Sequence, residues 1–137
     1  MILVDTGPLV ALIHQDDQLH QLCKQEFRSL SEPLGTSWPV LTEAMHLLRF
    51  SWEAQNALWE MVETGAVEIL TLGHSDIPRM KELMRKYRDL PMDIADAALV
   101  RIAEREKIRR IFTLDQRGFQ IYRPFRLGRF SILPSLA

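Results

Sequence analysis

Short apolar runs alternate along the chain with longer segments of helical periodicity. The runs that predict strands are residues 1–4, 34–37, 67–70, 110–114 and 130–133. Most of the segments between them carry apolar residues at helical spacing. Strands that alternate with helices form parallel sheets covered by helices on both faces. The sequence therefore predicts an α/β fold with a central parallel sheet.

Length and composition narrow the class of protein. The chain has 137 residues without a repeat or a linker, so we expect one domain over 1–137. A formal net charge of -1 gives no general attraction to nucleic acid, so such binding requires a local basic patch. One cysteine, Cys23, excludes an internal disulfide. No basic leader precedes the first apolar run, and no run approaches the ~18 apolar residues of a membrane span. We expect a cytoplasmic protein without a membrane segment.

Acidic residues stand at unusual places in this pattern. Asp5 and Asp115 each follow a predicted strand directly. Glu43 lies beside the apolar stripe of a helical segment, and Asp93 and Asp96 open a helix that is otherwise almost entirely apolar. Ligand sites in open α/β sheets form at the carboxyl ends of the strands. We therefore expect these acids to converge at one edge of the sheet.

Each acid also has a purely structural explanation. Asp5 suits a turn, Glu43 suits the boundary of a buried face, and Asp93 and Asp96 suit the first turn of a helix. Together, however, like-charged carboxylates a few ångströms apart destabilise one another unless a divalent cation lies between them. Oxygen ligands without paired Cys or His favour Mg²⁺ or Mn²⁺ over Zn²⁺. The pattern predicts a carboxylate-lined metal site.

Four short motifs carry a family resemblance. They are Asp-Thr-Gly at 5–7, Thr-Glu-Ala at 42–44, Met-Asp-Ile-Ala-Asp-Ala-Ala-Leu-Val at 92–100 and Thr-Leu-Asp at 113–115, with Phe119 close behind. In order and spacing the chain resembles the PIN-domain ribonucleases, particularly the VapC-type toxins of bacterial and archaeal toxin–antitoxin pairs. The resemblance covers essentially the whole chain.

The resemblance implies a three-layer α/β/α PIN-like fold and an endoribonuclease that depends on Mg²⁺ or Mn²⁺. By motif position it implies a catalytic, metal-binding quartet of Asp5, Glu43, Asp96 and Asp115. It further implies Asp93 as an auxiliary metal ligand, and Thr6 and Thr113 as hydroxyl groups that support the site. Such relatives are usually homodimers, and a small antitoxin protein inhibits them by covering the acidic site.

A basic rim is needed beside the acids, because phosphate contacts supply much of the affinity for RNA. Arg117, Arg123 and Arg126 follow Asp115 closely and are candidate RNA contacts. Arg117 also departs from the family pattern, since many relatives have an acid or polar residue there. The alternative is a solvated arginine-rich tail whose aromatic residues pack on the core. Similarly, Trp52 and Trp59 belong either to the core or to a surface that binds a second copy or a partner.

Three other functions are alternatives to the nuclease. A PIN-like module without catalysis, which binds protein or RNA, is the stronger alternative, and Arg117 keeps it open. A phosphoacceptor receiver domain needs a lysine at a late strand end, whereas the four lysines here all fall in predicted helices. A phosphatase with an aspartyl nucleophile needs Asp-x-Asp after the first strand, where this chain has Gly7.

Overall fold

The central sheet has five short parallel strands in the spatial order β3-β2-β1-β4-β5. The computed structural model describes residues 1–135. The strands are β1 (Ile2–Val4), β2 (Leu34–Thr36), β3 (Val67–Ile69), β4 (Arg110–Phe112) and β5 (Ser131–Leu133). β1 lies at the centre, where Leu3 pairs with Gly35 of β2 on one side and with Ile111 of β4 on the other. The predicted parallel sheet is confirmed.

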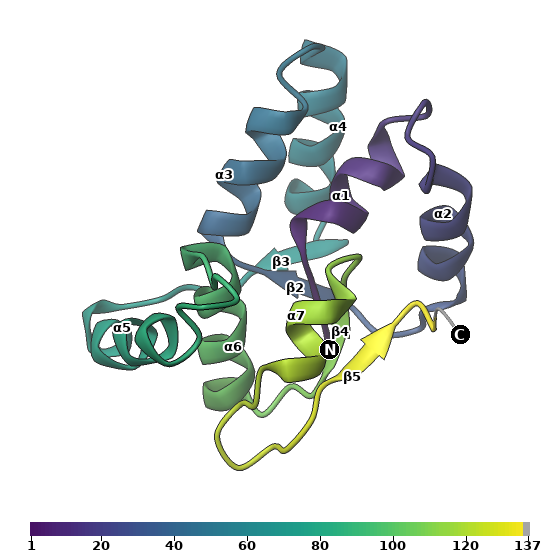
Figure 1. The fold of residues 1–137 in the computed structure, drawn as a ribbon. Coiled ribbons are helices and arrows are strands. Elements are labelled where there is room, and N and C mark those ends of the chain that lie inside the picture. Colours follow the sequence, from purple (N-terminus) through teal and green to yellow (C-terminus); the bar gives the residue numbers. More distant parts are fainter. Residues whose placement is uncertain (136–137) are drawn as a thin grey trace.

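Helices cover both faces of this sheet (Figure 1). From β1 to β3 the chain passes through α1 (Thr6–Ile13), α2 (His20–Ser29), α3 (Trp38–Leu47) and α4 (Trp52–Glu63). It returns to β4 and β5 through the 3-10 helix η1 (His74–Asp76), α5 (Ile77–Lys86), α6 (Ile94–Glu106) and α7 (Gln116–Ile121). Because parallel crossovers are right-handed, the two directions of travel put the two sets of helices on opposite faces. The three-layer α/β/α arrangement is confirmed.

α6 places an acidic side chain in the interior of the protein. Every residue from Ala95 to Val100 is buried, Asp96 included. Alanine favours the helix and its small side chain lets neighbouring elements approach closely. Asp93 starts α6 as its N-cap, and Lys107 ends it in the left-handed conformation with φ 58°. No helix within residues 1–135 has the length and the apolar character needed to cross a membrane.

Two helices have their first turn fixed by an aspartate. α1 begins at Thr6, two residues before Pro8, with the Asp5 side chain as its cap. The arginine-rich tail predicted after Asp115 begins with α7, for which Asp115 is the N-cap. This helix has six residues and contains Gly118, so its helical periodicity is weak in the sequence.

A cluster of ion pairs joins α5 to α6. The Asp76 carboxylate accepts hydrogen bonds from Arg101 at 2.7 Å and from Arg105 at 2.9 Å. The Glu104 carboxylate accepts one from Arg79 at 2.6 Å and another from the backbone amide of the loop after α7 at 2.8 Å. The side chains of Asp76 and Glu104 are only 3% and 4% exposed. This α5–α6 ion-pair cluster consists of Asp76, Arg79, Arg101, Glu104 and Arg105.

Candidate active site

Asp5 lies at the carboxyl end of the central strand and is held on both of its oxygens. Oδ1 accepts a hydrogen bond from the Thr6 amide at 2.8 Å, and Oδ2 accepts one from the Thr113 hydroxyl at 2.8 Å. Thr113 reaches Asp5 because it follows β4, whose Phe112 pairs with Val4 of β1. The strand-end rule therefore brings residues 5 and 113 together, as the sequence predicts.

Asp93 and Asp96 reach the same edge from the start of α6. Asp93 Oδ1 accepts a hydrogen bond from the Asp96 amide at 2.8 Å, so Asp93 is the N-cap of the helix. The Asp96 side chain is buried, and its Oδ2 accepts a hydrogen bond from the Tyr122 hydroxyl at 3.0 Å. The structural explanation thus holds for Asp93, whereas Asp96 is a buried carboxylate.

Asp115 joins this group from the start of α7. Its amide donates to the Thr113 hydroxyl at 3.0 Å, so one hydroxyl connects Asp5 with Asp115. A Cβ atom at Gly118 would lie 3.0 Å from Asp115 Oδ2 and 3.2 Å from the Tyr122 hydroxyl oxygen. α7 therefore needs glycine there to bring its first turn against both groups.

Glu43 approaches from α3, with its side chain exposed to solvent. The helix starts directly after β2 with Ser37 as its N-cap, so its first turns lie at the carboxyl edge of the sheet. After burial, the charge of Glu43 is one of the contributions that raise the pKa of Asp5. The structure therefore groups the five predicted acids, which we call the acidic edge: Asp5, Glu43, Asp93, Asp96 and Asp115.

Burial and mutual repulsion disfavour the ionised form of two carboxylates at the acidic edge. Burial, with smaller contributions from the charges of Glu43 and Asp115, raises the pKa of Asp5 to about 6. Burial, followed by repulsion from Asp93 and Asp5, raises the pKa of Asp96 to about 7. The ion pairs formed by residues 1–135 involve neither Asp5 nor Asp96. A bound cation would relieve this repulsion.

The donor atoms at the acidic edge fit a hard divalent cation. All are carboxylate oxygens, the ligands that Mg²⁺ and Mn²⁺ prefer. Beside Asp5, the Thr6 hydroxyl is buried and lacks a hydrogen-bond partner among the described residues, which suits a water of an ion's hydration shell. Within residues 1–135 no three Asp, Glu, His or Cys side chains are placed so that they could hold an ion by themselves.

The three predicted RNA-contact arginines lie at different distances from the acids. Arg117 is exposed in the first turn of α7, two residues after Asp115. The Arg123 guanidinium donates to the carbonyl oxygen of Ile121 at the end of α7. Arg126 follows Phe125, whose amide is bound to Glu104. Because Glu104 lies eight residues beyond Asp96 on α6, it is ~12 Å farther along the helix. Of the three, Arg117 is the nearest in sequence to an acid of the edge.

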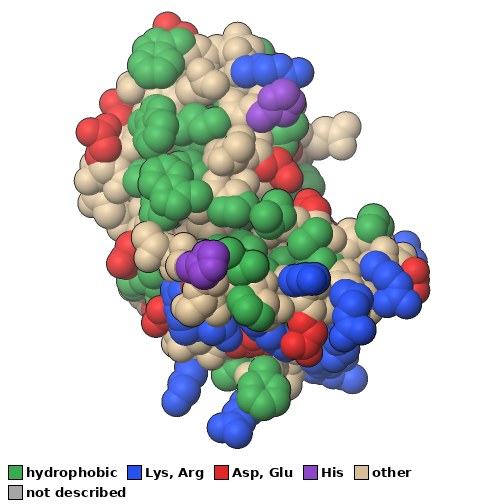
Figure 2. Space-filling model, turned by 90° about the vertical axis from the view of Figure 1, so that its left-hand side faces the viewer, with side chains coloured by type: hydrophobic (Ala, Val, Ile, Leu, Met, Phe, Trp, Pro, Cys, Tyr) green, Lys and Arg blue, Asp and Glu red, His purple; other side chains and the backbone are tan. Residues whose placement is uncertain are grey.

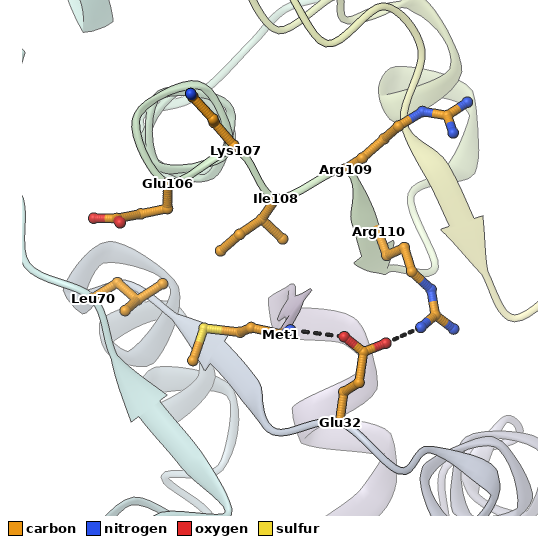
Figure 3. Close-up of a pocket in the computed structure, with 8 residues that line it drawn as sticks. All are labelled: Met1, Glu32, Leu70, Glu106, Lys107, Ile108, Arg109 and Arg110. Carbon is orange, nitrogen blue, oxygen red and sulfur yellow. Dashed lines mark hydrogen bonds and ion pairs between the residues drawn. The ribbon is translucent and has the colours of Figure 1, made fainter.

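A separate cavity of about 550 Å³ opens at the amino edge of the sheet (Figure 3). Glu32 lies in its wall, where it pairs with the N-terminal ammonium of Met1 at 2.8 Å and with Arg110. In Figure 3 both partners point toward Glu32. Two cations surround one carboxylate here, so this group carries a net positive charge, in contrast to the carboxylates of the acidic edge.

Comparison with known proteins decides the family. The sequence model of the PIN domain matches residues 2–123. The chain belongs to the PIN-domain family. Within it, the chain is 32% identical over 135 residues to ribonuclease VapC26 of Mycobacterium tuberculosis, an alignment that covers 97% of this chain and 100% of the relative. The predicted resemblance to PIN-domain proteins of the VapC type is confirmed.

Solved structures show the same PIN fold. VapC20 of Mycobacterium tuberculosis, described as a toxin that cleaves the sarcin–ricin loop, aligns with a TM-score of 0.76 at 20% identity, over 86% of this chain and 94% of that one. A toxin–antitoxin complex from Klebsiella pneumoniae gives 0.67 at 16% identity, over 87% and 90%. VapBC2 from Rickettsia felis, bound to a promoter DNA fragment, gives 0.63 at 15%, over 96% and 98%.

In this PIN domain, sequence reasoning missed two residues that shape the acidic edge. Tyr122 donates to Asp96 from 26 residues away, and Gly118 makes room for that hydroxyl beside Asp115. A buried tyrosine hydroxyl normally has a hydrogen-bond partner, which is the signal that the sequence offered for Tyr122. Its particular partner depends on how α7 packs against α6.

Proposed function

We propose that this PIN-domain protein is a metal-dependent endoribonuclease, acting as one domain over 1–137 and as the toxin of a toxin–antitoxin pair. The observation that carries the proposal is the pair of buried carboxylates, Asp5 and Asp96, which repel each other and lack a cation within residues 1–135. Relationship to ribonuclease VapC26 supports RNA as the substrate. The acidic composition of the edge supports Mg²⁺ or Mn²⁺ as the cofactor.

In this proposal the carboxylates of the acidic edge hold the ion. Asp5 and Asp96, which are buried, and Asp115, which is exposed, would be its ligands, and Asp93 would complete a second metal position. A bound Mg²⁺ or Mn²⁺ would neutralise the phosphate, lower the pKa of a bound water and stabilise the leaving 3′-oxygen. Without that charge the acidic edge repels RNA, so the cation is also needed for substrate binding.

The remaining polar groups orient these ligands and the water. The Thr113 hydroxyl holds Asp5 at 2.8 Å, and the unpartnered Thr6 hydroxyl would be free to bind a water beside the ion. Glu43 is exposed at the mouth of the edge, where it either binds the ion or orients the attacking water. We assign catalysis to Asp5, Glu43, Asp96 and Asp115.

The decisive test is metal-dependent RNA cleavage by wild type and by Asp96→Asn. A pool of structured RNA is incubated with Mg²⁺, with Mn²⁺ and with EDTA. We expect discrete cuts with the metals, and a loss of ~10³-fold or more in the variant because several kcal/mol of transition-state stabilisation is removed. Asp89→Asn is the matched control, since Asp89 is an exposed acid outside the acidic edge and should leave cleavage unchanged.

Other outcomes separate the metal site from the substrate. If no RNA is cut, but Mn²⁺ raises the melting temperature of wild type and not of Asp96→Asn, the metal site stands and the RNA substrate is wrong. If Mn²⁺ has no effect on either protein, the catalytic proposal fails and the non-catalytic binding module replaces it.

We further propose that RNA runs from the acidic edge over α5. Lys81 and Arg85 are exposed four residues apart on one flank of α5, and Arg88 is exposed just after the end of the helix. None of the three forms an ion pair with a carboxylate in the described part of the chain. The end of α5 reaches the acidic edge, because the Tyr87 ring lies 5.0 Å from the Tyr122 ring. Arg117, with Arg123 and Arg126 farther out, would extend this rim.

The partners proposed for this chain are a second copy of itself and a small antitoxin, in the cytoplasm. Trp38, Trp52 and Trp59 are 52%, 63% and 38% exposed. Figure 2 shows one face of the protein with hydrophobic side chains spread over its upper part and Lys and Arg gathered below. Exposed aromatic residues of this kind are enriched at interfaces. Light scattering should give twice the 15.9 kDa chain mass. A monomeric mass would contradict the homodimer. Failure to bind a small DNA-binding protein encoded by a neighbouring gene would contradict the antitoxin partner.

A further inference from the structure

We propose that the Tyr122 hydroxyl is a positioning group of the metal site, which fixes the Asp96 carboxylate so that its second oxygen stays open to the cation. The inference rests on the proposed function, because that proposal supplies the metal ion. It adds Tyr122, a residue that is not an acid, to the metal site.

The hydrogen bond between Tyr122 and Asp96 is buried. Tyr122 is 2% exposed, and its hydroxyl oxygen lies 3.0 Å from Asp96 Oδ2. A phenol is protonated at neutral pH, so it donates to the carboxylate. Within residues 1–135 the Asp96 side chain accepts no other hydrogen bond, whereas Asp5 is held on both oxygens by Thr6 and Thr113. The orientation of Asp96 therefore depends on this one donor.

Aromatic packing holds the Tyr122 ring in place. The ring meets Phe119 edge-on at a centroid distance of 5.1 Å and an angle of 84°, and it meets Tyr87 at 5.0 Å and 65°. Edge-to-face pairs of this kind are favourable and directional. The Tyr122 amide also donates to the Gly118 carbonyl at 3.0 Å, so the residue ends α7. The hydroxyl is therefore delivered to Asp96 by a rigid support.

The hydrogen bond from Tyr122 opposes rotation of the Asp96 carboxylate. The last torsion of an aspartate side chain has broad energy wells, so packing or a hydrogen bond must set the direction of its oxygens. Asp96 is repelled by Asp93, Asp5 and Asp115, and without a donor it would turn away from them. Second-layer donors of this type commonly change metal affinity by about 10–100-fold.

Tyr122→Phe tests the inference, and Tyr87→Phe is its matched control. Both changes remove one hydroxyl from the same aromatic cluster, but the Tyr87 hydroxyl accepts a hydrogen bond from the Arg123 amide and touches no acid of the edge. Mn²⁺ affinity is measured by titration calorimetry on metal-free protein, with melting temperature in EDTA as the readout of folding. We expect Tyr122→Phe to bind Mn²⁺ about 10–100-fold more weakly. Tyr87→Phe should bind it as wild type does, and both should melt in EDTA close to wild type.

Cleavage adds a readout that a merely structural role would not change. At saturating Mn²⁺ Tyr122→Phe should regain most of the wild-type rate, because orientation is then imposed by the bound ion. Unchanged Mn²⁺ affinity in Tyr122→Phe, or an equal loss in Tyr87→Phe, overturns the positioning role alone. Wild type that binds no Mn²⁺ overturns this role and the metal site together. Wild type that binds Mn²⁺ but cuts no RNA overturns the proposed substrate and leaves the role of Tyr122 intact.

Discussion

Two groups of buried acids lie along α6 and differ in what surrounds them. At one end Asp96 belongs to the acidic edge, where its neighbours are other carboxylates and its pKa rises, chiefly through burial, to about 7. Toward the other end Glu104 belongs to the α5–α6 ion-pair cluster with Asp76. Burial alone would raise the pKa of Asp76, but the Gly73 amide and two arginines reverse this and hold it below the usual range.

The difference separates structural acids from functional ones. Asp76 and Glu104 each meet at least one guanidinium within 3 Å, so their burial is compensated inside the protein. Asp5 and Asp96 are compensated by hydroxyl and amide donors only, which leaves a net negative edge open to an ion. Burial by itself therefore does not mark a site, whereas burial without a cation does.

The largest effect on stability is expected from Asp76→Asn, compared with Asp96→Asn. Asp76→Asn leaves Arg101 and Arg105 without a carboxylate and should lower the free energy of unfolding by about 2–3 kcal/mol, less than for a fully buried pair because both arginines remain partly exposed. Asp96→Asn removes a repelled charge and should not destabilise the metal-free protein. Urea unfolding in EDTA checks both. Equal losses of unfolding free energy in the two variants would contradict the distinction between the ion-pair cluster and the acidic edge.

A smaller effect is expected from pH, with opposite signs for the two groups. Asp76, with a lowered pKa, contributes stability that is present above its unfolded pKa of ~4 and is lost as the pH falls below that. Asp5 and Asp96, at about 6 and 7, contribute stability that is present below ~4 and is lost as the pH rises through those values. Between pH ~4 and ~7 the metal-free wild type should therefore lose stability.

Melting curves in EDTA across that pH window check the sign. The double variant Asp5→Asn/Asp96→Asn should lose less stability than wild type, and Mn²⁺ should restore wild type at the alkaline end. If the melting temperatures of wild type and the double variant change with pH in parallel, the ionised carboxylates of the acidic edge do not destabilise the protein.

The smallest effect is expected on RNA binding by the basic rim. The basic residues near α5 can be compared there with the arginines of the tail. Lys81, Arg85 and Arg88 are replaced by alanine in one variant, and Arg123, Arg126 and Arg129 in another, so that both lose three charges. In an Asp96→Asn background, the α5 variant should bind single-stranded RNA about tenfold more weakly and lose ~2 from its salt slope, at ~0.7 for each phosphate contact. The tail variant should change less. The reverse order would place the RNA on the tail.

The acidic edge could be predicted because strand ends in a parallel sheet have a fixed geometry. Asp5 and Asp115 follow β1 and β4, which are neighbours, and the Thr113 hydroxyl connects them. The apolar surroundings of Asp96 in the sequence likewise indicated a buried carboxylate, which the structure bears out.

Features that depend on packing between helices could not be predicted in the same way. α7 has too few residues to show a period, and its Gly118 weakens the helical signal although close packing requires it. The tail aromatics Phe119 and Tyr122 are buried, as the structural explanation of that segment predicted, whereas Phe125 is 63% exposed. The contact between Tyr122 and Asp96 needs the approach of α7 to α6, which no local pattern encodes.

The bond between Thr113 and Asp5 closes a loop of 108 residues, and this has a consequence for protein synthesis. Ribosomes add ~5–20 residues each second, so Asp5 is made roughly 5–20 s before its hydroxyl partner. During that interval β1 lacks β4, and neither Asp96 nor Asp115 has yet been brought to its end. An unfinished chain therefore carries no assembled acidic edge, and translation itself delays the appearance of the site until most of the protein has been made.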